Sequence, residues 1–334
     1  RMVAEYDIDD DLPEGERTMP AVWQRSAKIR PDEPFLWFSG RTSRTAEELD
    51  RDVRRAIGAL DRLGVKKADR ICIFMKNSPE MLCAMLALWH MGAVVVPLSA
   101  QMVGVLLADQ VRRARPLFVI ADDDLAGCVA AANAPVVELS RLLAEAAAHA
   151  PGSPGATVSN VSFRDPALVL YTSGSTGPSK GCVLSHHFCV YYGWVFWRHM
   201  GYRNDDTIYS CLPLNHVHAL FASFLPAALA GAQFSFAERF TASRYWHDIA
   251  DSKATTCSAI GHSIPQNTRQ HPRLAQRNNE NAVVPVGRDR QEERVICCCR
   301  WSSCQPSVSS STNSEFSFAL RSVPIRSLRF VTDP

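Results

Sequence analysis

A run of ten residues directly after one apolar segment carries the side chains best suited to chemistry. It reads TSGSTGPSKG, from Thr172 to Gly181, and follows the apolar stretch ALVLY. A chain of phosphate groups is bound by converging N–H and O–H donors, by a cation, and by backbone that no Cβ atom obstructs. The run offers all three, so it predicts a polyphosphate site. Its hydroxyls, glycines and cation are Thr172, Ser173, Ser175, Thr176, Gly174, Gly177 and Lys180.

Two other interpretations of this run are a Walker P-loop and a mobile surface loop. In the Walker P-loop, G-x-x-x-x-G-K-[ST], the Lys follows a Gly and precedes a Ser or Thr. Counted from Gly174, those two positions hold Ser179 and Gly181, which argues against a Walker-type NTPase. A mobile surface loop also has this composition. It does not explain why a strand pattern comes immediately before the run and a helix pattern soon after it.

The elements that must position this run alternate between strand and helix patterns up to about residue 260. Such alternation predicts an α/β fold with largely parallel sheets flanked by helices. A capping box at Thr45–Glu48 begins one helix, and Pro79 stands at a first-turn position of another. The expected strands are Ile71–Met75, Val94–Val96, Leu117–Ile120, Val136–Leu139, Ala167–Tyr171, Thr207–Leu212, Gln233–Phe236 and Ala254–Ile260. The later expected helices are Ser185–His199, Phe221–Leu229 and Ala242–Asp251.

The pattern divides the chain into four parts. We expect a first α/β subdomain at 1–148, a linker at 149–160, and a second, partial subdomain with the phosphate loop at 161–262. Residues 263–334 show no sustained period and are rich in Arg, Ser and Cys without any Lys. This composition predicts a non-homologous tail that is either disordered or read out of frame. Disorder would follow because so few apolar residues cannot offset the entropy of ordering.

Composition narrows the class of protein. The chain has 334 residues, is 46% apolar and carries a net charge of +2, which favours a soluble globular protein and indicates no nucleic-acid partner. Met81–Leu98 is interpreted as a buried helix followed by a buried strand and not as a transmembrane segment. The acidic segment RMVAEYDIDDDLPEGE has no apolar h-region, so we expect no secretory signal and a cytoplasmic protein with reduced cysteines. The sequence does not predict an oligomeric state.

Three stretches together resemble the adenylate-forming superfamily, also called the AMP-dependent synthetases and ligases. YTSGSTGPSKGCVLSH is similar to that family's phosphate-binding signature, although Ser179 replaces the usual Pro. KNSPEMLCAMLALWHMGAVVVPL resembles its N-S-P-E helix and the following strand. LPLNHVHALFASF resembles its P-L-F-H segment, with His216 in place of that His. The similarity covers the N-terminal part of the family and is greatest to acyl-CoA synthetases and carnitine- or crotonobetaine-CoA ligases.

The resemblance implies a two-step reaction on a small-molecule carboxylic acid of fatty acid metabolism. The acid attacks the α-phosphate of Mg²⁺-ATP to give an acyl-adenylate, and coenzyme A then displaces AMP to give a thioester. Carried over by position, the loop binds ATP through Thr172, Ser173, Gly174, Ser175, Thr176, Gly177 and Lys180. Thr176 is the implied metal contact, and the implied catalytic residues are Lys180 and His216, the latter orienting the acid without titrating.

Each of these roles has a plainer alternative. Lys180 would otherwise be an ordinary surface lysine, and His216 a satisfied histidine at a helix start. His218 is more typical of a structural residue. The aromatic segment Tyr191–Trp197 either lines an acyl pocket or packs as core.

The sequence also departs from the family. It contains neither the aromatic-Gly-x-Thr-Glu stretch that holds adenine and metal nor the Thr-Gly-Asp segment that holds ribose. We therefore expect a truncated acid–thiol ligase that is inactive alone. The alternative is a non-enzymatic nucleotide-binding or interaction fragment.

Overall fold

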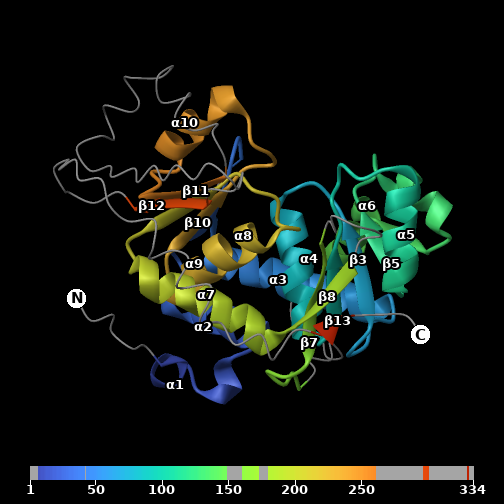
Figure 1. Ribbon diagram of the computed structural model, residues 1–334, viewed down its shortest axis with the longest axis horizontal. Coiled ribbons are helices and arrows are strands. Elements are labelled where there is room, and N and C mark those ends of the chain that lie inside the picture. Colours follow the sequence, from blue (N-terminus) through green and yellow to red (C-terminus); the bar gives the residue numbers. More distant parts are fainter. Residues whose placement is uncertain are drawn as a thin grey trace.

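The computed structural model describes residues 7–41, 43–148, 160–172, 180–260, 296–300 and 329–330. Within these ranges the strands form two sheets with helices between and around them, so the α/β prediction is confirmed (Figure 1). One sheet has the order β13-β8-β7-β4-β3-β5-β6, and the other β12-β11-β9-β10-β1-β2.

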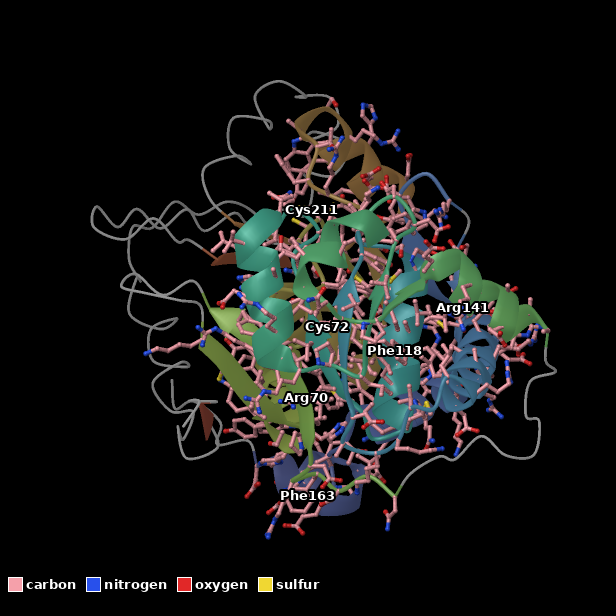
Figure 2. The ribbon with its side chains drawn as sticks, turned by 90° about the vertical axis from the view of Figure 1, so that its right-hand side faces the viewer. Arg70, Cys72, Phe118, Arg141, Phe163 and Cys211 are labelled. Carbon is pink, nitrogen blue, oxygen red and sulfur yellow. The ribbon has the colours of Figure 1, made fainter. Side chains whose placement is uncertain are left out.

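The seven-stranded sheet carries the predicted phosphate loop. Pairing is parallel between β3 and β4, β3 and β5, β4 and β7, and β5 and β6, so the carboxyl ends of these five strands share one edge. β8 and β13 are added antiparallel at the β7 side. The strands are β3 Arg70–Phe74, β4 Val94–Pro97, β5 Phe118–Ala121, β6 Val136–Glu138, β7 Pro166–Thr172, β8 Lys180–Ser185 and β13 Arg329–Phe330. Figure 2 labels Arg70 and Cys72 on β3 and Phe118 on β5.

The six-stranded sheet carries the segment with His216. β1, β10, β9 and β11 are mutually parallel in that order, and β2 and β12 are antiparallel at the two edges. The strands are β1 Pro34–Phe38, β2 Arg44–Thr45, β9 Thr207–Ser210, β10 Gln233–Phe236, β11 Thr256–Ile260 and β12 Ile296–Arg300.

The helices separate the two sheets and cover their outer faces. Side chains of α2, α3, α4, α7 and α9 share one buried cluster with residues of both sheets. α5 and η2 cover the other face of the seven-stranded sheet, and α10 covers the other face of the six-stranded one (Figure 1). The helices are α1 Ile8–Asp11, η1 Glu14–Glu16, α2 Met19–Ile29, α3 Ala46–Arg62, α4 Pro79–His90, α5 Gly104–Ala114, η2 Ala126–Ala132, α6 Leu139–Ala147, α7 His186–Met200, α8 Val217–Ala219, η3 Leu220–Phe224, α9 Leu225–Ala230 and α10 Ala242–Asp251.

Local sequence explains where the two central helices begin. The Thr45 hydroxyl accepts the Glu48 N–H at 3.1 Å, and the Glu48 carboxylate accepts the Thr45 N–H at 2.9 Å, so the predicted capping box is present at the start of α3. Ser78 caps α4, with Pro79 in its first turn. Met81–Leu98 is a buried helix followed by the buried strand β4, as expected, and no described helix is long and apolar enough to cross a membrane.

The structure adds three strands that the sequence analysis did not predict in the well-patterned part of the chain. β1 and β2 lie before the first predicted strand, and β8 lies where the chain was expected to proceed from the loop to a helix. The loop therefore joins two antiparallel strands. Strands from both sides of residues 149–160 enter each sheet, since β1 and β2 join β10 while β7 joins β4. The predicted division into subdomains stays a prediction.

Of the segment 263–334, the structure describes β12 and β13. The linker residues 149–159 and the rest of 263–334 lie outside the described residues.

Candidate functional site

The predicted phosphate loop is anchored at both ends by one antiparallel strand pair. Thr172 ends β7, Lys180 begins β8, and these two residues are register partners. Lys180 is exposed. The predicted binding residues Ser173, Gly174, Ser175, Thr176 and Gly177 lie outside the described residues, as does the side chain of Thr172. The structure therefore places the loop's anchors at the carboxyl end of β7, and the roles of the residues between them stay predictions.

The base of the loop is fixed to α5 by a tyrosine. The Tyr171 hydroxyl donates to the Gln110 carbonyl at 2.9 Å, and burial raises the pKa of Tyr171 to about 12. Gly181 makes room for this packing, because a Cβ there would lie 3.0 Å from Cγ1 of Val169 and 3.5 Å from the Tyr171 ring. Tyr171 is thus a neutral hydrogen-bond donor at neutral pH that holds the strand pair against its neighbouring helix.

His216 lies on the loop that follows β9 of the six-stranded sheet. The residue is exposed, and its backbone N–H donates to the Pro213 carbonyl at 3.0 Å. Its Nδ1 accepts the N–H of His218 at 3.3 Å, so the imidazole caps the short helix α8. Because Nδ1 is the acceptor, the neutral ring carries its proton on Nε2. A ring N–H donor on an exposed residue is suited to orienting a carboxylate.

His218 differs from its neighbour in burial. Only 3% of its surface is exposed, and the Phe196 ring meets it edge-on at 6.3 Å. Burial, and then the charge of His216, lower the pKa of His218 to about 4. His218 is therefore neutral at physiological pH, which suits the structural role that the sequence indicated.

The aromatic residues of α7 pack against the core. Phe188, Tyr192 and Phe196 form a ladder with centroid separations of 6.1 and 5.4 Å, and Tyr192 meets Phe221 of the π-helical turn η3 at 5.7 Å. This contact brings α7 close to the helix that follows His216. A Cβ on Gly193 would lie 2.5 Å from the Leu225 Cβ, so only glycine fits the crossing. Of the two interpretations of Tyr191–Trp197, this packing favours core.

One polar residue near the site was not assigned a role by the sequence analysis. Asn77 follows β3, is 6% exposed, and bonds through its side chain to Leu212, Leu214 and Ala237 of the other sheet. Figure 2 labels Cys211, at which the loop held by Asn77 begins. The asparagine is part of the quoted N-S-P-E stretch, but its partners lie more than a hundred residues away in sequence. No local pattern identifies them.

The donor set fits a polyphosphate better than it defines a metal site. The exposed ammonium of Lys180 and the anchored end of β7 frame a hydroxyl- and glycine-rich run. Among the described residues, no group of three or more His, Cys, Asp or Glu side chains is placed to hold a metal ion. Thr176 as a metal contact stays a prediction.

Comparison with known proteins tests the resemblance. The model of the AMP-binding enzyme family matches residues 23–304, which is most of the chain. This chain belongs to the AMP-binding enzyme family. The match includes residues 263–304, which the sequence analysis had assigned to a non-homologous tail.

Members of the AMP-binding enzyme family that the chain resembles include CoA ligases. It is 31% identical over 261 residues to the medium/long-chain-fatty-acid–CoA ligase FadD6 of Mycobacterium tuberculosis, covering 75% of this chain and 43% of that protein. It is 24% identical over 271 residues to the crotonobetaine/carnitine–CoA ligase of Proteus mirabilis, covering 74% and 51%. The chain thus spans about half the length of the curated relatives it matches.

The fold is that of the same family's N-terminal part. A solved fatty acyl CoA synthetase of Mycobacterium tuberculosis superposes with a TM-score of 0.70 at 22% identity, covering 79% of this chain and 53% of that one. The recognition of the family and the predicted fold class are both confirmed.

Proposed function

We propose that this chain forms the phosphate- and acid-binding part of an ATP-dependent ligase that converts a carboxylic acid, of the fatty acid class, to its CoA thioester. The observation that carries the proposal is the anchored run from Thr172 to Lys180 at the carboxyl edge of a parallel sheet in a member of the AMP-binding family. The exposed His216 on the other sheet supports it, as does the similarity to FadD6.

The reaction requires two balanced displacements. A carboxylate oxygen forms a bond to the α-phosphorus of ATP while the bond from that phosphorus to the β-bridging oxygen breaks and pyrophosphate leaves. The thiolate of coenzyme A then attacks the acyl carbon and forms the thioester C–S bond, while the bond from that carbon to the phosphate oxygen breaks and AMP leaves. Such transfers depend mainly on positioning and on charge neutralisation.

The chain's own residues supply these two effects. The Lys180 ammonium neutralises phosphate charge at the base of the loop, and the hydroxyls and backbone N–H groups between Thr172 and Gly177 donate to phosphate oxygens. The Nε2–H of His216 orients the acid carboxylate without changing its protonation state. Mg²⁺, when bound, supplies further charge neutralisation, with Thr176 as its contact from this loop.

We further propose that the 334 residues alone are inactive and complete neither the adenylation step nor thioester synthesis. The support is that no aromatic-Gly-x-Thr-Glu or Thr-Gly-Asp stretch occurs in the sequence, and that the match covers 43% of FadD6.

Calorimetric titration with ATP and an ATP–pyrophosphate exchange assay with medium- and long-chain saturated fatty acids test both proposals. We expect ATP to bind and exchange to be absent. Lys180→Ala should weaken ATP binding about tenfold or more, because a hydrogen bond to a charged group contributes about 1.5–3 kcal/mol. Lys28→Ala, which removes an exposed lysine of α2, is the matched control and should leave ATP affinity unchanged.

The outcomes separate the two proposals. Absence of ATP binding by the unmodified chain, or equal losses in both lysine variants, would overturn the nucleotide-binding role. Exchange activity that Lys180→Ala removes would support the ligase function and overturn the proposal of inactivity.

A further inference from the structure

A single buried side chain connects the two sheets at their carboxyl edges. Asn77 Nδ2 donates to the carbonyls of Leu212 at 2.9 Å and Ala237 at 3.1 Å, and its Oδ1 accepts the N–H of Leu214 at 2.8 Å. These partners are 135, 160 and 137 residues away in the sequence. The contact is therefore tertiary, and its residues come together only in the folded chain.

The positions of the three partners give the contact its significance. Asn77 lies just after β3 of the seven-stranded sheet, Leu212 just after β9, and Ala237 immediately after β10 of the six-stranded sheet. β9 and β10 are parallel neighbours, so their carboxyl ends lie side by side. Open α/β sheets bind ligands at the carboxyl ends of their strands. Asn77 thus joins the ligand-binding edge of one sheet to that of the other.

Only an amide of this length satisfies all three partners. The two carbonyls require donors and the Leu214 N–H requires an acceptor, so one planar group must present two N–H bonds and one oxygen. These partners also fix the orientation of the amide. Exchanging its O and N atoms would place the amide oxygen against two carbonyls and the NH₂ group against the Leu214 N–H. Aspartate would offer acceptors alone, and serine a single donor. Either substitution would leave at least one of the two carbonyls unpaired, which destabilises the folded chain.

The bonds continue from Asn77 to His216 through a short turn. Leu212 and Leu214 are held directly by Asn77, and Leu214 is fully buried. The Pro213 carbonyl between them accepts the N–H of His216, whose ring then caps α8. Two of the restraints on the exposed His216 therefore come from the backbone before it and from the helix that it caps.

We propose that Asn77 is a positioning residue that holds the loop from Leu212 to His216, and with it the His216 imidazole, at the edge where the two sheets meet. This inference rests on the proposed function for its chemical consequence, since His216 is the group proposed to orient the acid. A residue that merely filled a polar site in the core would stabilise the fold without affecting the state of His216.

The neighbouring Ser78 provides a matched control. Its hydroxyl accepts the Met81 N–H at 3.1 Å and caps α4, and it makes no bond to the loop from Leu212 to His216 in the described residues. Ser78→Ala should lower the midpoint of unfolding through loss of that cap. This variant therefore measures how His216 responds to a loss of stability next to Asn77 when the hydrogen bonds of Asn77 are kept.

The first readout is the ¹⁵N tautomer signature of the imidazole rings in the full chain, with the His216 signal assigned by its loss in His216→Gln. In the unmodified protein we expect a single Nε2–H form. Asn77→Ala should convert the His216 signal to a mixture of both tautomers, whereas Ser78→Ala should leave it unchanged. Asn77→Asp, which keeps the shape and the acceptor but loses both donors, carries the test if the alanine variant does not fold.

The second readout is ligand affinity. Asn77→Asp should weaken binding of a medium-chain fatty acid about tenfold, while ATP affinity, governed by the loop on β7 and β8, stays the same. An unchanged His216 signal in both Asn77 variants would overturn the inference, as would the same change in Ser78→Ala. Equal losses of acid and ATP affinity would also overturn it. If the unmodified chain binds neither ligand, the proposed function fails, and the tautomer signature still decides the role of Asn77.

Discussion

The two halves of the candidate site are held in different ways. The loop that begins at Thr172 is carried by a backbone ladder, in which β7 and β8 pair over six register positions that end at Thr172 and Lys180. The loop that carries His216 is held by the side chain of Asn77, which comes from the other sheet. The first arrangement depends on residues close in sequence and the second on a tertiary contact. The two loops should therefore respond differently to the same kind of change.

The largest effect we expect is with pH, and here the two halves should respond alike, because each contains a buried histidine. Met19 N–H donates to Nδ1 of His186 at 3.1 Å beside β8, and burial lowers the pKa of His186 to about 4, as it does for His218 beside His216. Both folded pKa values lie below the unfolded value of 6.5. Their contribution is therefore complete above pH 6.5 and is lost as the pH falls from 6.5 to 4, by about 3 kcal/mol for each ring.

Urea unfolding across this pH range measures that loss. His186→Gln and His218→Gln should each reduce the pH dependence by about 3 kcal/mol. Burial also lowers the pKa of His90 and of His187, so part of the pH dependence should persist in both variants. A pH dependence that neither variant reduces would mean that other groups are responsible.

The next largest effect concerns the helix crossing that supports the His216 side. Gly193→Ala places a Cβ 2.5 Å from the Leu225 Cβ, which belongs to a helix and cannot simply rotate away, so α7 and α9 must separate. Overpacking of this kind costs about 1–3 kcal/mol. Gly58→Ala in α3 is the matched control, since its Cβ meets only an arginine tip at 3.6 Å. It should stabilise the protein by about 0.5–1 kcal/mol. Thermal unfolding of the two variants should therefore shift in opposite directions.

The smallest expected effect is at the base of the loop on β7. Tyr171→Phe removes the bond to the Gln110 carbonyl, which contributes about 1 kcal/mol to stability. Because the strand ladder still anchors Thr172 and Lys180, ATP affinity should not change. A loss of ATP affinity comparable to that of Lys180→Ala would show that a side chain positions this loop too, and the contrast between the two halves would disappear.

The sequence predicted a phosphate loop because the whole pattern lies within ten residues. The structure describes the two strands that anchor it, and its phosphate-binding role stays a prediction. The sequence also predicted the parallel strands of the seven-stranded sheet, because each is a short apolar run. It predicted the start of α3 from the capping box. β8 was missed because KGCVLS follows glycine and serine without a period of its own. β1 was missed because its parallel partner β10 lies far along the chain, and β2, only two residues long, pairs with β1. Asn77 was quoted as part of a motif, yet its role depends on partners that only the fold brings near.

The pairing of β1 with β10 has a consequence for synthesis of the chain. Leu36 is the partner of Phe234, which is 234 − 36 = 198 residues later. At the usual elongation rates of about 5–20 residues per second, the apolar strand PFLWF waits roughly 10–40 s on the ribosome before its neighbour exists. During that time its hydrogen-bonding edge is open to any other strand. Nascent chains of this protein are therefore expected to depend on chaperones that cover the first forty-five residues until residue 236 has emerged.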